Sequence, residues 1–274
     1  MANRALITGA NGFLGKHVSA YLTQKNIEVI PLPHDLFYTY EENIEKFVKE
    51  AHADYIFHLA SYGNLSEQQK YIDDIYSGTI LATFNLLKAT RKLSYKAFIN
   101  ISSSSVLLDY ETMYSAGKKS QEALCRAFSN QYSLPIISVR PFSIYGPGEQ
   151  ETHLIPRLFR SCLYKEPMKF VGSPVHDYVY IDDIVAELYN IALNPTDWPT
   201  TEAMIGTGVK TSNDEVKLLI EAITGKKAKI TDTVEAKPYD SSSWVASPKQ
   251  GWVYFQSTPI AEGLQKVFKS YTLQ

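Results

Sequence analysis

Tyr114 and Lys118 form the pair of side chains in this sequence that best suits proton transfer. Residues four apart lie on the same face of a helix, one turn from each other. A lysine ammonium beside a phenol favours the phenolate and lowers the tyrosine pKa from about 10. Ser103, in a run of four serines upstream, offers a hydroxyl for a substrate oxygen. The three residues could move a proton to or from a carbonyl oxygen while a nicotinamide gives or takes a hydride.

The four-residue spacing alone does not identify this pair, because roughly one chance match is expected in a chain with 19 tyrosines. A second match joins Tyr21 to Lys25. Tyr21 stands at helical spacing from the apolar residues before it, which places it on the buried face of its helix. Tyr114 instead follows an expected strand that ends at residues 102–103. Because ligands of open parallel sheets lie outside the carboxyl ends of the strands, position favours Tyr114.

Three glycines follow the first apolar run of the chain, in the segment ITGANGFLG at residues 7–15. Gly9, Gly12 and Gly15 stand between an expected strand and an expected helix. Glycines let the backbone turn sharply and approach a pyrophosphate, and the helix N-terminus presents free N–H groups and a positive dipole end. This context predicts a dinucleotide-binding turn, although a glycine-rich turn without a ligand has the same composition.

The end of the second expected strand bears on the choice between NAD and NADP. A carboxylate at this tip would hold the ribose 2′-hydroxyl of NAD. The sequence reads VIPLPHDL, so that Pro33 and His34 occupy the tip and Asp35 follows one or two positions late. His34 could contact a 2′-phosphate or could be a solvated loop histidine. The missing carboxylate favours NADP and makes His34 a candidate cofactor-binding residue.

Short apolar runs alternate with helical patterns throughout the first half of the chain. Strands that alternate with helices form right-handed βαβ units and a parallel sheet. We therefore expect an α/β fold with a doubly wound parallel sheet. The expected strands are 4–8, 27–32, 54–60, 96–103 and 135–141, and the expected helices are one that begins near residue 14, 42–51, 74–90 and 115–132.

The alternation ends after Pro141, and the remaining chain mixes turns, helices and short strands. Ser212 precedes an acidic pair, as at a helix start, and Gly225 can end that helix. The pattern predicts a nucleotide-binding domain at 1–144 and a smaller mixed lobe at 145–274, with 178–206 packing back on the first domain. The expected elements of the lobe are helices 155–164, 181–194, 212–225 and 259–271 and a strand at 168–172.

Composition and charge exclude several classes of protein. Hydrophobic residues make up 45% and charged residues 20% of the chain, and the net charge is −2. This balance provides no basic field for nucleic acid or for an anionic membrane. The two cysteines suggest neither a disulfide framework nor a metal site, and no apolar run has the length of a signal peptide or a membrane span. We expect a cytoplasmic protein that binds no metal.

Six motifs occur in order along the chain: TGANGFLG, DYIFHLA, FINISSSSV, YSAGK, RPFSIYGPG and HDYVYIDDIV. In these motifs the sequence resembles the extended short-chain dehydrogenases/reductases of the NAD-dependent epimerase/dehydratase family, and the likeness covers nearly the whole chain. The resemblance implies a Rossmann-type doubly wound parallel sheet with a smaller mixed C-terminal substrate-binding lobe. It also implies an enzyme that binds NAD or NADP and acts on a nucleotide-activated sugar.

The resemblance gives roles to individual residues. Tyr114 and Lys118 match the family's catalytic tyrosine and lysine, and Ser103 matches its catalytic serine or threonine. The candidate cofactor-binding residues are then Gly9, Asn11, Gly12, Phe13, Leu14, Gly15, His34, Asp35, Leu36, Leu59, Ala60, Ser61, Ile101, Tyr114, Lys118, Pro141, Phe142 and Ile144. The candidate substrate-binding residues are Ser103, Ser104, Ser143 and His176.

The chain departs from the family pattern at the candidate site. Dehydratases of the family usually carry Asp and Glu directly after the catalytic residue, where this chain has Ser104 and Ser105. Hydroxyls cannot serve as carboxylate acid and base groups, so we expect no 4,6-dehydratase. Ser143 replaces a frequent Asn. His176 replaces an Arg that often contacts the nucleotide diphosphate, and a neutral His binds phosphate more weakly than an Arg fork.

Three functions remain open on these residues. A reductase of a nucleotide-linked 4-keto sugar would take a hydride from NADPH and a proton from Tyr114. A 4-epimerase with tightly bound NAD would use the same three residues to oxidise and re-reduce its substrate. A non-catalytic NAD(P)-binding sensor or scaffold would not need them. The reductase is favoured by the absence of the dehydratase carboxylates at positions 104 and 105 and of an acidic residue at the tip of the second strand.

The resemblance also implies a homodimer, because relatives commonly pair through the helices that correspond to 74–90 and 115–132. Several apolar residues on these helices fit such an interface, and they fit an ordinary core face equally well: Leu86, Leu87, Ala123, Leu124 and Phe128. Their exposure in the folded chain distinguishes the two roles.

Overall fold

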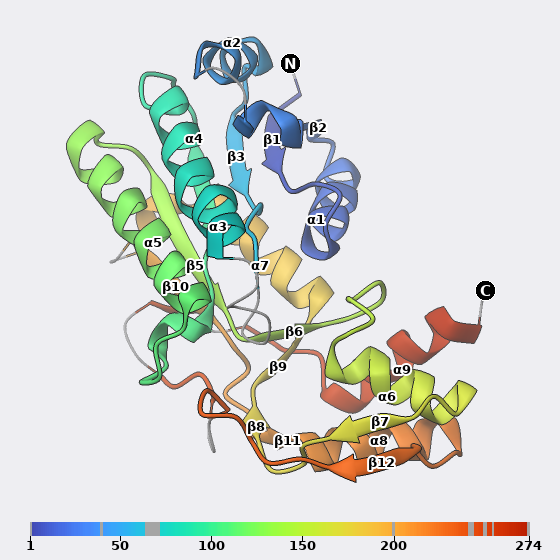
Figure 1. Cartoon of the computed structure of the whole chain (residues 1–274). Helices are drawn as coiled ribbons and strands as arrows, with labels where there is room; N and C mark the ends of the chain where they lie inside the picture. Colours follow the sequence, from blue (N-terminus) through green and yellow to red (C-terminus); the bar gives the residue numbers. More distant parts are fainter. Residues whose placement is uncertain are drawn as a thin grey trace. The chain divides into compact units, whose positions relative to one another are not determined.

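The computed structural model describes residues 2–38, 41–63, 72–198, 201–240, 244–248, 251–253 and 255–272. The chain forms two compact units, whose elements are labelled in Figure 1. The first unit comprises Met1–Pro141 and Val185–Met204, and the second comprises Phe142–Ile184 and Ile205–Gln274. The first passage between units lies close to the predicted boundary at residue 144, and the other two lie within the predicted return segment 178–206.

A doubly wound sheet is the main feature of the fold. Its strands in the described ranges are β1 (Arg4–Thr8), β2 (Glu28–Pro31), β3 (Tyr55–His58), β4 (Ala97–Ile101), β5 (Ile136–Pro141), β10 (Glu202–Ile205) and β13 (Trp252–Val253). They pair in the order β13-β10-β5-β4-β3-β1-β2, and the neighbours from β5 to β2 are all parallel. The strand order reverses between β1 and β3, which confirms the predicted α/β class and locates the switch point where such sheets bind ligands.

The helices of the first unit pack on this sheet through its alternating side chains. They are α1 (Phe13–Gln24), α2 (Glu41–Ala51), α4 (Ala82–Thr90), α5 (Met113–Tyr132) and the second part of α7 (Ile181–Leu193). The helices α2, α4 and α5 pack together (Figure 1), and their apolar residues form one core with Leu6, Ile56 and Phe98 of the strands. Because neighbouring residues of a strand point to opposite faces, Ile7 and Phe57 are buried on the other face.

Two residues that fitted either a core or an interface belong to this core. Leu86 and Leu87 of α4 have no exposed surface. Ala123 of α5 is exposed, and Leu124 and Phe128 are half-buried. Leu124 and Phe128 pack against the core and keep part of their surface exposed, whereas Leu86 and Leu87 have no surface left for a partner.

The predicted helix 74–90 is not regular. It consists of α3 (Ile72–Ile75), a π-helical turn at Tyr76–Leu81 and then α4. Thr79 in the π-helical turn is held by the segment after β3: Tyr62 donates its N–H to Thr79 Oγ1 at 3.1 Å, and Thr79 Oγ1 donates to the Tyr62 carbonyl at 3.3 Å. The widened turn brings the Thr79 hydroxyl to that segment. A regular helical period of 3.6 residues does not predict this widened turn.

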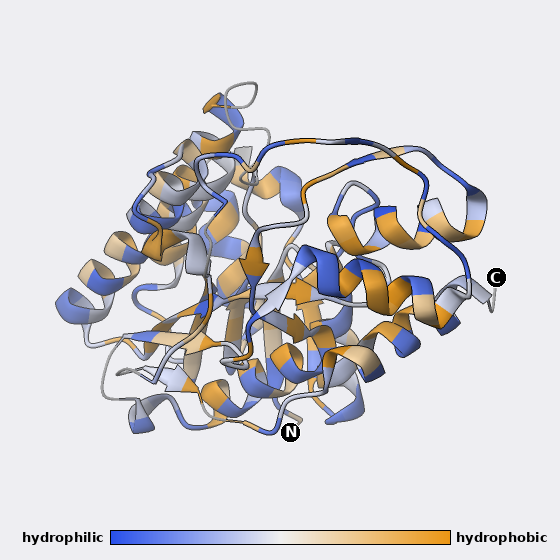
Figure 2. Ribbon diagram, turned by 90° about the horizontal axis from the view of Figure 1, so that it is seen from below, coloured by the Kyte–Doolittle hydropathy of each residue, from blue (hydrophilic) through white to orange (hydrophobic). Residues whose placement is uncertain are grey.

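The second unit contains short strand pairs and three amphipathic helices. The pairs are β6 (Ser143–Tyr145) with β9 (Tyr178–Tyr180), β8 (Val175–His176) with β11 (Thr211–Ser212), and β7 (Met168–Phe170) with β12 (Ile230–Thr233). The helices are α6 (Leu154–Tyr164), α8 (Asn213–Thr224) and α9 (Ile260–Thr272), each with hydrophobic and hydrophilic residues (Figure 2). A capping box of Ser212 and Glu215 begins α8, and Gly225 ends it, as predicted.

None of the helices in the described ranges combines the length and the apolar character that crossing a bilayer requires.

Candidate active site

The predicted glycine turn joins β1 to α1 through backbone atoms. Gly9 has a φ of +69°, a left-handed conformation that favours glycine. Gly12 is the N-cap of α1, and its N–H donates to the Gly9 carbonyl at 3.0 Å. A Cβ atom on Gly15 would collide with the same carbonyl. The shape of the turn therefore requires glycine at Gly9 and Gly15.

The start of α1 suits an anionic ligand. Gly12 has no side chain to cap the first turn, and Asn11 beside it is exposed. Phe13 and Leu14 begin the helix and are half-buried. Free N–H groups and the positive end of the helix dipole attract phosphate groups. The turn therefore fits the pyrophosphate of the dinucleotide that the sequence predicts.

The end of β3 lies against the glycine turn. A Cβ atom on Gly9 would lie 2.9 Å from the Ala60 nitrogen, so the two backbones approach closely. The Ala60 N–H donates to Thr8 Oγ1 at 3.0 Å. Leu59 and Ala60 are half-buried, and Ser61 is exposed. The structure thus places residues 59–61 beside the turn.

The end of β2 carries no carboxylate. The strand ends at Pro31, and a 3₁₀ turn follows at His34–Tyr38. The side chains of His34 and Asp35 are 73% and 100% exposed, and His34 Nδ1 lies 3.8 Å from Asp35 Oδ1. Leu36, in the same turn, is half-buried. The Asp35 carboxylate is thus turned to solvent.

Ser103 caps the turn that follows β4. Its Oγ accepts a hydrogen bond from the Ser105 N–H at 3.1 Å, at the start of the 3₁₀ turn Ser104–Leu107. Ser104 and Ser105 are buried, and within the described ranges the Ser105 hydroxyl has no hydrogen-bond partner. Hydroxyls rather than carboxylates therefore stand directly after Ser103.

A capping box places Tyr114 next to Ser103. Thr112 and Ser115 exchange side-chain and backbone hydrogen bonds, which begins α5 at Met113. Tyr114 then stands in the first turn of the helix, half-buried. Burial raises the pKa of Tyr114 above its ordinary value, and a hydrogen bond with Ser103 offsets part of the increase.

Lys118 lies one turn further along α5, with 1% of its surface exposed. Its Nζ donates to the Ile101 carbonyl at 2.8 Å and to Gln121 Oε1 at 3.1 Å. The same nitrogen lies 5.9 Å from the centre of the Tyr114 ring. Burial lowers the pKa of Lys118 to about 7, against the opposing effect of the nearby Glu122 carboxylate.

One part of the sequence prediction is wrong: the pKa of Tyr114 is raised, not lowered. Four-residue spacing does bring the ammonium near the phenol, as predicted. The spacing does not reveal that the fold buries Lys118 and half-buries Tyr114, and removal from water disfavours the charged form of each. The Lys118 ammonium also directs its hydrogen bonds to Ile101 and Gln121.

The second tyrosine–lysine match has a different setting. Lys25 Nζ lies 5.1 Å from the centre of the Tyr21 ring, at the C-terminal end of α1. Lys25 is exposed, and Tyr21 is half-buried against the ring of Tyr189 at 5.7 Å. The prediction that Tyr21 is buried is therefore only partly right. The pair lies away from the end of α1 that begins at the glycine turn.

Ser143 and His176 come together in the second unit, where β6 pairs with β9. Ser143 Oγ lies 3.4 Å from His176 Nδ1. The His176 ring lies between Trp244 and Tyr178, with ring centres 5.7 and 5.5 Å away. Burial lowers the pKa of His176, which favours the neutral ring. Next to it, the buried Asp177 carboxylate accepts from the backbone of Thr207, Gly208 and Ala246 and fixes this part of the unit.

The segment after β5 holds the remaining predicted cofactor residues. Pro141 ends the strand and is buried. Phe142 is also buried, and its N–H donates to the Ile205 carbonyl at 3.0 Å. Ile144 lies in β6 and is half-buried. Neighbouring β-strands thus hold the backbone at Phe142 and Ile144.

Sequence reasoning missed several buried polar residues around Lys118. His58, Thr83 and Gln121 have no exposed surface, and all three are hydrogen-bonded to one another or to Lys118. A signal was present for two of them. His58 interrupts an otherwise apolar strand, and Gln121 follows Lys118 by three residues on the same helix face.

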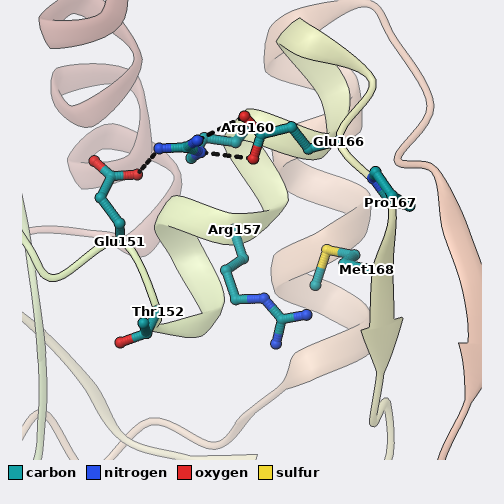
Figure 3. A pocket seen from close by; sticks show the side chains of 7 residues that line it. All are labelled: Glu151, Thr152, Arg157, Arg160, Glu166, Pro167 and Met168. Atoms are coloured by element: carbon teal, nitrogen blue, oxygen red, sulfur yellow. Dashed lines mark hydrogen bonds and ion pairs between the residues drawn. The ribbon is translucent and has the colours of Figure 1, made fainter.

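The second unit also contains a cavity of about 390 Å³ (Figure 3), which none of the predicted site residues lines. Arg160 donates to Glu151 and to both carboxylate oxygens of Glu166, so one guanidinium is shared between two carboxylates. Arg157 lies apart from this cluster, and its Nη2 is 3.5 Å from the Lys169 carbonyl. The residues that line the cavity are Glu151, Thr152, Arg157, Arg160, Glu166, Pro167 and Met168.

The fold and the first-unit site define an enzyme of the short-chain dehydrogenase/reductase type. A glycine turn follows the first strand of a doubly wound sheet, and a serine, a tyrosine and a lysine gather at the end of β4. Residues 5–204 match the NAD dependent epimerase/dehydratase family. The chain belongs to that family, as its motifs indicated.

Curated relatives and solved structures agree with this assignment. The chain is 28% identical to a protein of Bacillus subtilis described as an uncharacterised UDP-glucose epimerase, over 95% of both chains. It is 27% identical to the CDP-abequose synthase of Salmonella typhimurium, over 76% of both. A UDP-N-acetylglucosamine 4-epimerase of Methanobrevibacter ruminantium has the same fold, with a TM-score of 0.85 at 19% identity over 100% of this chain and 99% of the other. The Thermus thermophilus UDP-glucose 4-epimerase, solved with NAD, has a TM-score of 0.81 at 20% identity over 98% and 99%.

Proposed function

We propose that this protein reduces the 4-keto group of a nucleotide-activated sugar, with NADPH as the cofactor. The observation that carries the proposal is the placement of Ser103, Tyr114 and Lys118 at the end of β4, two strands from the glycine turn. Bound NADPH would supply the hydride that adds to the carbonyl carbon.

Each of the three residues then has a different role at the carbonyl oxygen. The Tyr114 phenol donates its proton to that oxygen as the C–O double bond becomes single. The Ser103 hydroxyl, which hydrogen-bonds Tyr114, orients the same oxygen. Lys118 directs its hydrogen bonds to the Ile101 carbonyl and to Gln121, and it contributes positive charge near the Tyr114 ring when it is protonated.

The raised pKa of Tyr114 fits a phenol that donates a proton. A reductase begins its cycle with a phenol that can give a proton, whereas oxidation of a sugar hydroxyl begins with a phenolate that can accept one. Burial keeps Tyr114 in the protonated form. The resting site therefore suits the direction in which a carbonyl is protonated.

The cofactor would lie on the glycine turn, with its pyrophosphate at the start of α1. Leu59 and Ala60 lie against the glycine turn and would flank that cofactor. The tip of β2, which carries no carboxylate, and the exposed His34 support NADP, and the Asp35 carboxylate in the same turn is fully exposed to solvent.

The candidate contacts of the sugar nucleotide stay those that the resemblance implies: Ser103, Ser104, Ser143 and His176. Serines at 104 and 105 support reduction over dehydration, because removal of water needs an acid and a base of the carboxylate kind. A largely neutral His176 supports a weaker hold on a diphosphate than an arginine would give.

A 4-epimerase is the second candidate, and the names of similar proteins favour it. The relative from Bacillus subtilis and the two solved structures described above carry epimerase names, and one of them holds NAD. An epimerase would retain NAD tightly and return each hydride to its substrate. The same three side chains would serve both reactions.

Cofactor analysis separates the two candidates. The purified protein is analysed by mass spectrometry for bound nucleotide and is then assayed for NADPH oxidation with UDP-, CDP- and dTDP-linked 4-keto sugars. We expect one NADPH oxidised for each sugar reduced. Tightly bound NAD, no net NADPH oxidation and interconversion of C4 epimers would instead identify the epimerase. A cellular role that survives Tyr114→Phe unchanged would favour the non-catalytic sensor or scaffold.

We also propose a homodimer that forms through an apolar surface on α4 and α5. This surface, the α4–α5 face, comprises Leu81 at the end of the π-helical turn and Phe84, Phe128 and Tyr132. Leu81 and Phe84 are each 38% exposed and Tyr132 is 45% exposed. The Phe128 ring lies 6.0 Å from Phe84 and 5.6 Å from Tyr132, so the aromatic residues are contiguous.

A cytoplasmic location stays a prediction, consistent with two unpaired, buried cysteines.

A further inference from the structure

Five buried side chains form a continuous path from Lys118 to the residue before the glycine turn. Lys118 Nζ donates to Gln121 Oε1 at 3.1 Å, and Gln121 Nε2 donates to Thr83 Oγ1 at 2.8 Å. His58 Nε2 lies 2.8 Å from the same Thr83 oxygen, and His58 Nδ1 lies 2.7 Å from Thr8 Oγ1. None of the five side chains has more than 1% of its surface exposed.

The hydrogen-bond directions along this path have one solution. The Thr83 hydroxyl donates its proton to the Thr79 carbonyl at 2.6 Å, so its oxygen accepts from both Gln121 and His58. His58 must then carry its proton on Nε2 and accept from Thr8 at Nδ1. Burial lowers the pKa of His58 to about 3, which agrees with a neutral ring.

The path also fixes which end of the Gln121 amide faces Lys118. Because Nε2 is committed to Thr83, the carbonyl oxygen Oε1 must point to the ammonium. The Ile101 carbonyl is the other acceptor of Lys118 and belongs to the backbone of β4. Gln121 is thus the side chain, among the described residues, that accepts a hydrogen bond from Lys118.

We propose that Gln121 is a positioning residue that holds Lys118 in its charged form and ties it, through Thr83 and His58, to the strand end that begins the glycine turn. The role of Lys118 rests on the proposed function, but its protonation state does not. Gln121 acts through Lys118, because its own side chain has no exposed surface that a substrate or cofactor could contact.

The other ionisable groups around Lys118 leave this role to Gln121. On α5 they are Tyr114, Glu122 and Cys125, on β3 there is His58, and on β5 there is Arg140. Glu122 is engaged by Arg140 at 2.6 and 2.7 Å and by Ser102 at 2.6 Å, and its charge reaches Lys118 only from a distance. The uncharged amide oxygen of Gln121 therefore makes the direct bond.

The test is a direct titration of Lys118 by ¹³C NMR of the lysine Cε atoms, assigned with Lys118→Met and needing no substrate. Gln121→Met keeps the length of the side chain and removes the acceptor, so the Lys118 titration should move down by about one pH unit. Gln121→Glu places a carboxylate at the same position and should move it upwards. Thr83→Val, which frees the Gln121 amide, should lower it by a smaller amount.

Gln131→Met is the matched control, because it makes the same replacement at an exposed position on the same helix. It should leave the Lys118 titration unchanged. Shifts in the same direction for Gln121→Met and Gln121→Glu, or no shift in either, would overturn the proposal. If Gln121→Met does not fold, Gln121→Glu and Thr83→Val decide the result.

A second measurement connects the titration to function. The pH above which the rate of NADPH oxidation falls should be about one unit lower in Gln121→Met than in the natural chain. It should be higher in Gln121→Glu. If the NMR titrations shift in opposite directions while no NADPH is oxidised at all, the positioning role stands and the reductase proposal fails. If the profile shifts and the titrations do not, Gln121 does not act through Lys118.

Discussion

Lys118 Nζ lies 5.9 Å from the centre of the Tyr114 ring and donates to the Ile101 carbonyl and to Gln121 rather than to the phenol. The ammonium therefore acts on the phenol through space, over a distance at which burial of both groups sets their protonation. In the folded chain burial favours a neutral phenol and lowers the pKa of Lys118 to about 7.

Tyr114→Phe removes the proton donor and leaves the ring in place. We expect kcat to fall by about 10²- to 10⁴-fold, the range for loss of a general acid, with NADPH binding unchanged. Steady-state kinetics and fluorescence titration of the cofactor measure the two effects. Tyr21→Phe, at the second tyrosine–lysine match, should leave both at their natural values, and an equal loss there would contradict the choice of Tyr114.

Lys118→Met removes a buried ammonium, and its effect on stability should depend on pH. Burial lowers the pKa of Lys118 from 10.5 to about 7, so the unfolded chain binds more protons between these values. The cost of burying the charge is complete below pH 7 and fades as the pH rises towards 10.5. The variant should therefore gain more free energy of unfolding at pH 6 than at pH 9, by about 1–4 kcal/mol.

Urea unfolding at both pH values measures this difference for Lys118→Met. Lys119→Met is the matched control, since Lys119 is 43% exposed and pairs with Glu111 on the surface. It should show no comparable dependence on pH. A gain that increases from pH 6 to pH 9 in Lys118→Met would contradict the assigned direction of the pKa shift.

Gly15→Ala should disrupt the glycine turn. The added Cβ would collide with the Gly9 carbonyl, which is backbone and cannot move without changing the turn. We expect NADPH to bind at least about tenfold more weakly, a loss of about 1.4 kcal/mol. Gly225→Ala is the control, because Gly225 has a φ of +65° but open space around it. It should cost about 1 kcal/mol of stability and leave cofactor binding intact.

Phe84→Lys should break the proposed homodimer by placing a charge in the α4–α5 face. Phe84 is 38% exposed and touches the Phe128 ring, so the substitution does not open the core. Light scattering should show a dimer for the natural chain and a monomer for the variant. Tyr164→Lys, at a 59% exposed aromatic residue on α6, should remain dimeric. A natural chain that is monomeric at micromolar concentration would contradict the proposal.

The local patterns of the sequence predicted the strands, the glycine turn and the Tyr114–Lys118 pair. Apolar runs and turn residues act over a few positions, so each can be recognised without the rest of the fold. The capping box at Ser212 and Glu215 is of this kind, and it begins α8 where expected. Spacing likewise placed Lys118 one turn from Tyr114.

The network behind Lys118 could not be predicted in the same way. Gln121, Thr83 and His58 lie on α5, α4 and β3, and they meet only because these elements pack in one register. Burial is also a property of the whole fold. The four-residue spacing therefore predicted a lowered pKa for Tyr114, whereas burial raises it. Phe84 and Leu86 stand two positions apart in one helix, and the first is exposed while the second is buried. Only the packed structure shows which of the two belongs to the core.

The three passages of the chain between its units have a consequence for truncation and for recombination. Residues 1–144 would lack Val185–Met204, which contributes most of β10 and part of α7 to the first unit. Such a fragment would expose the β5 edge that β10 covers, and an uncovered edge strand invites aggregation. A single crossover at residue 144 therefore cannot exchange the second unit of one protein for that of another, and a chimera of two family members would need junctions at all three passages.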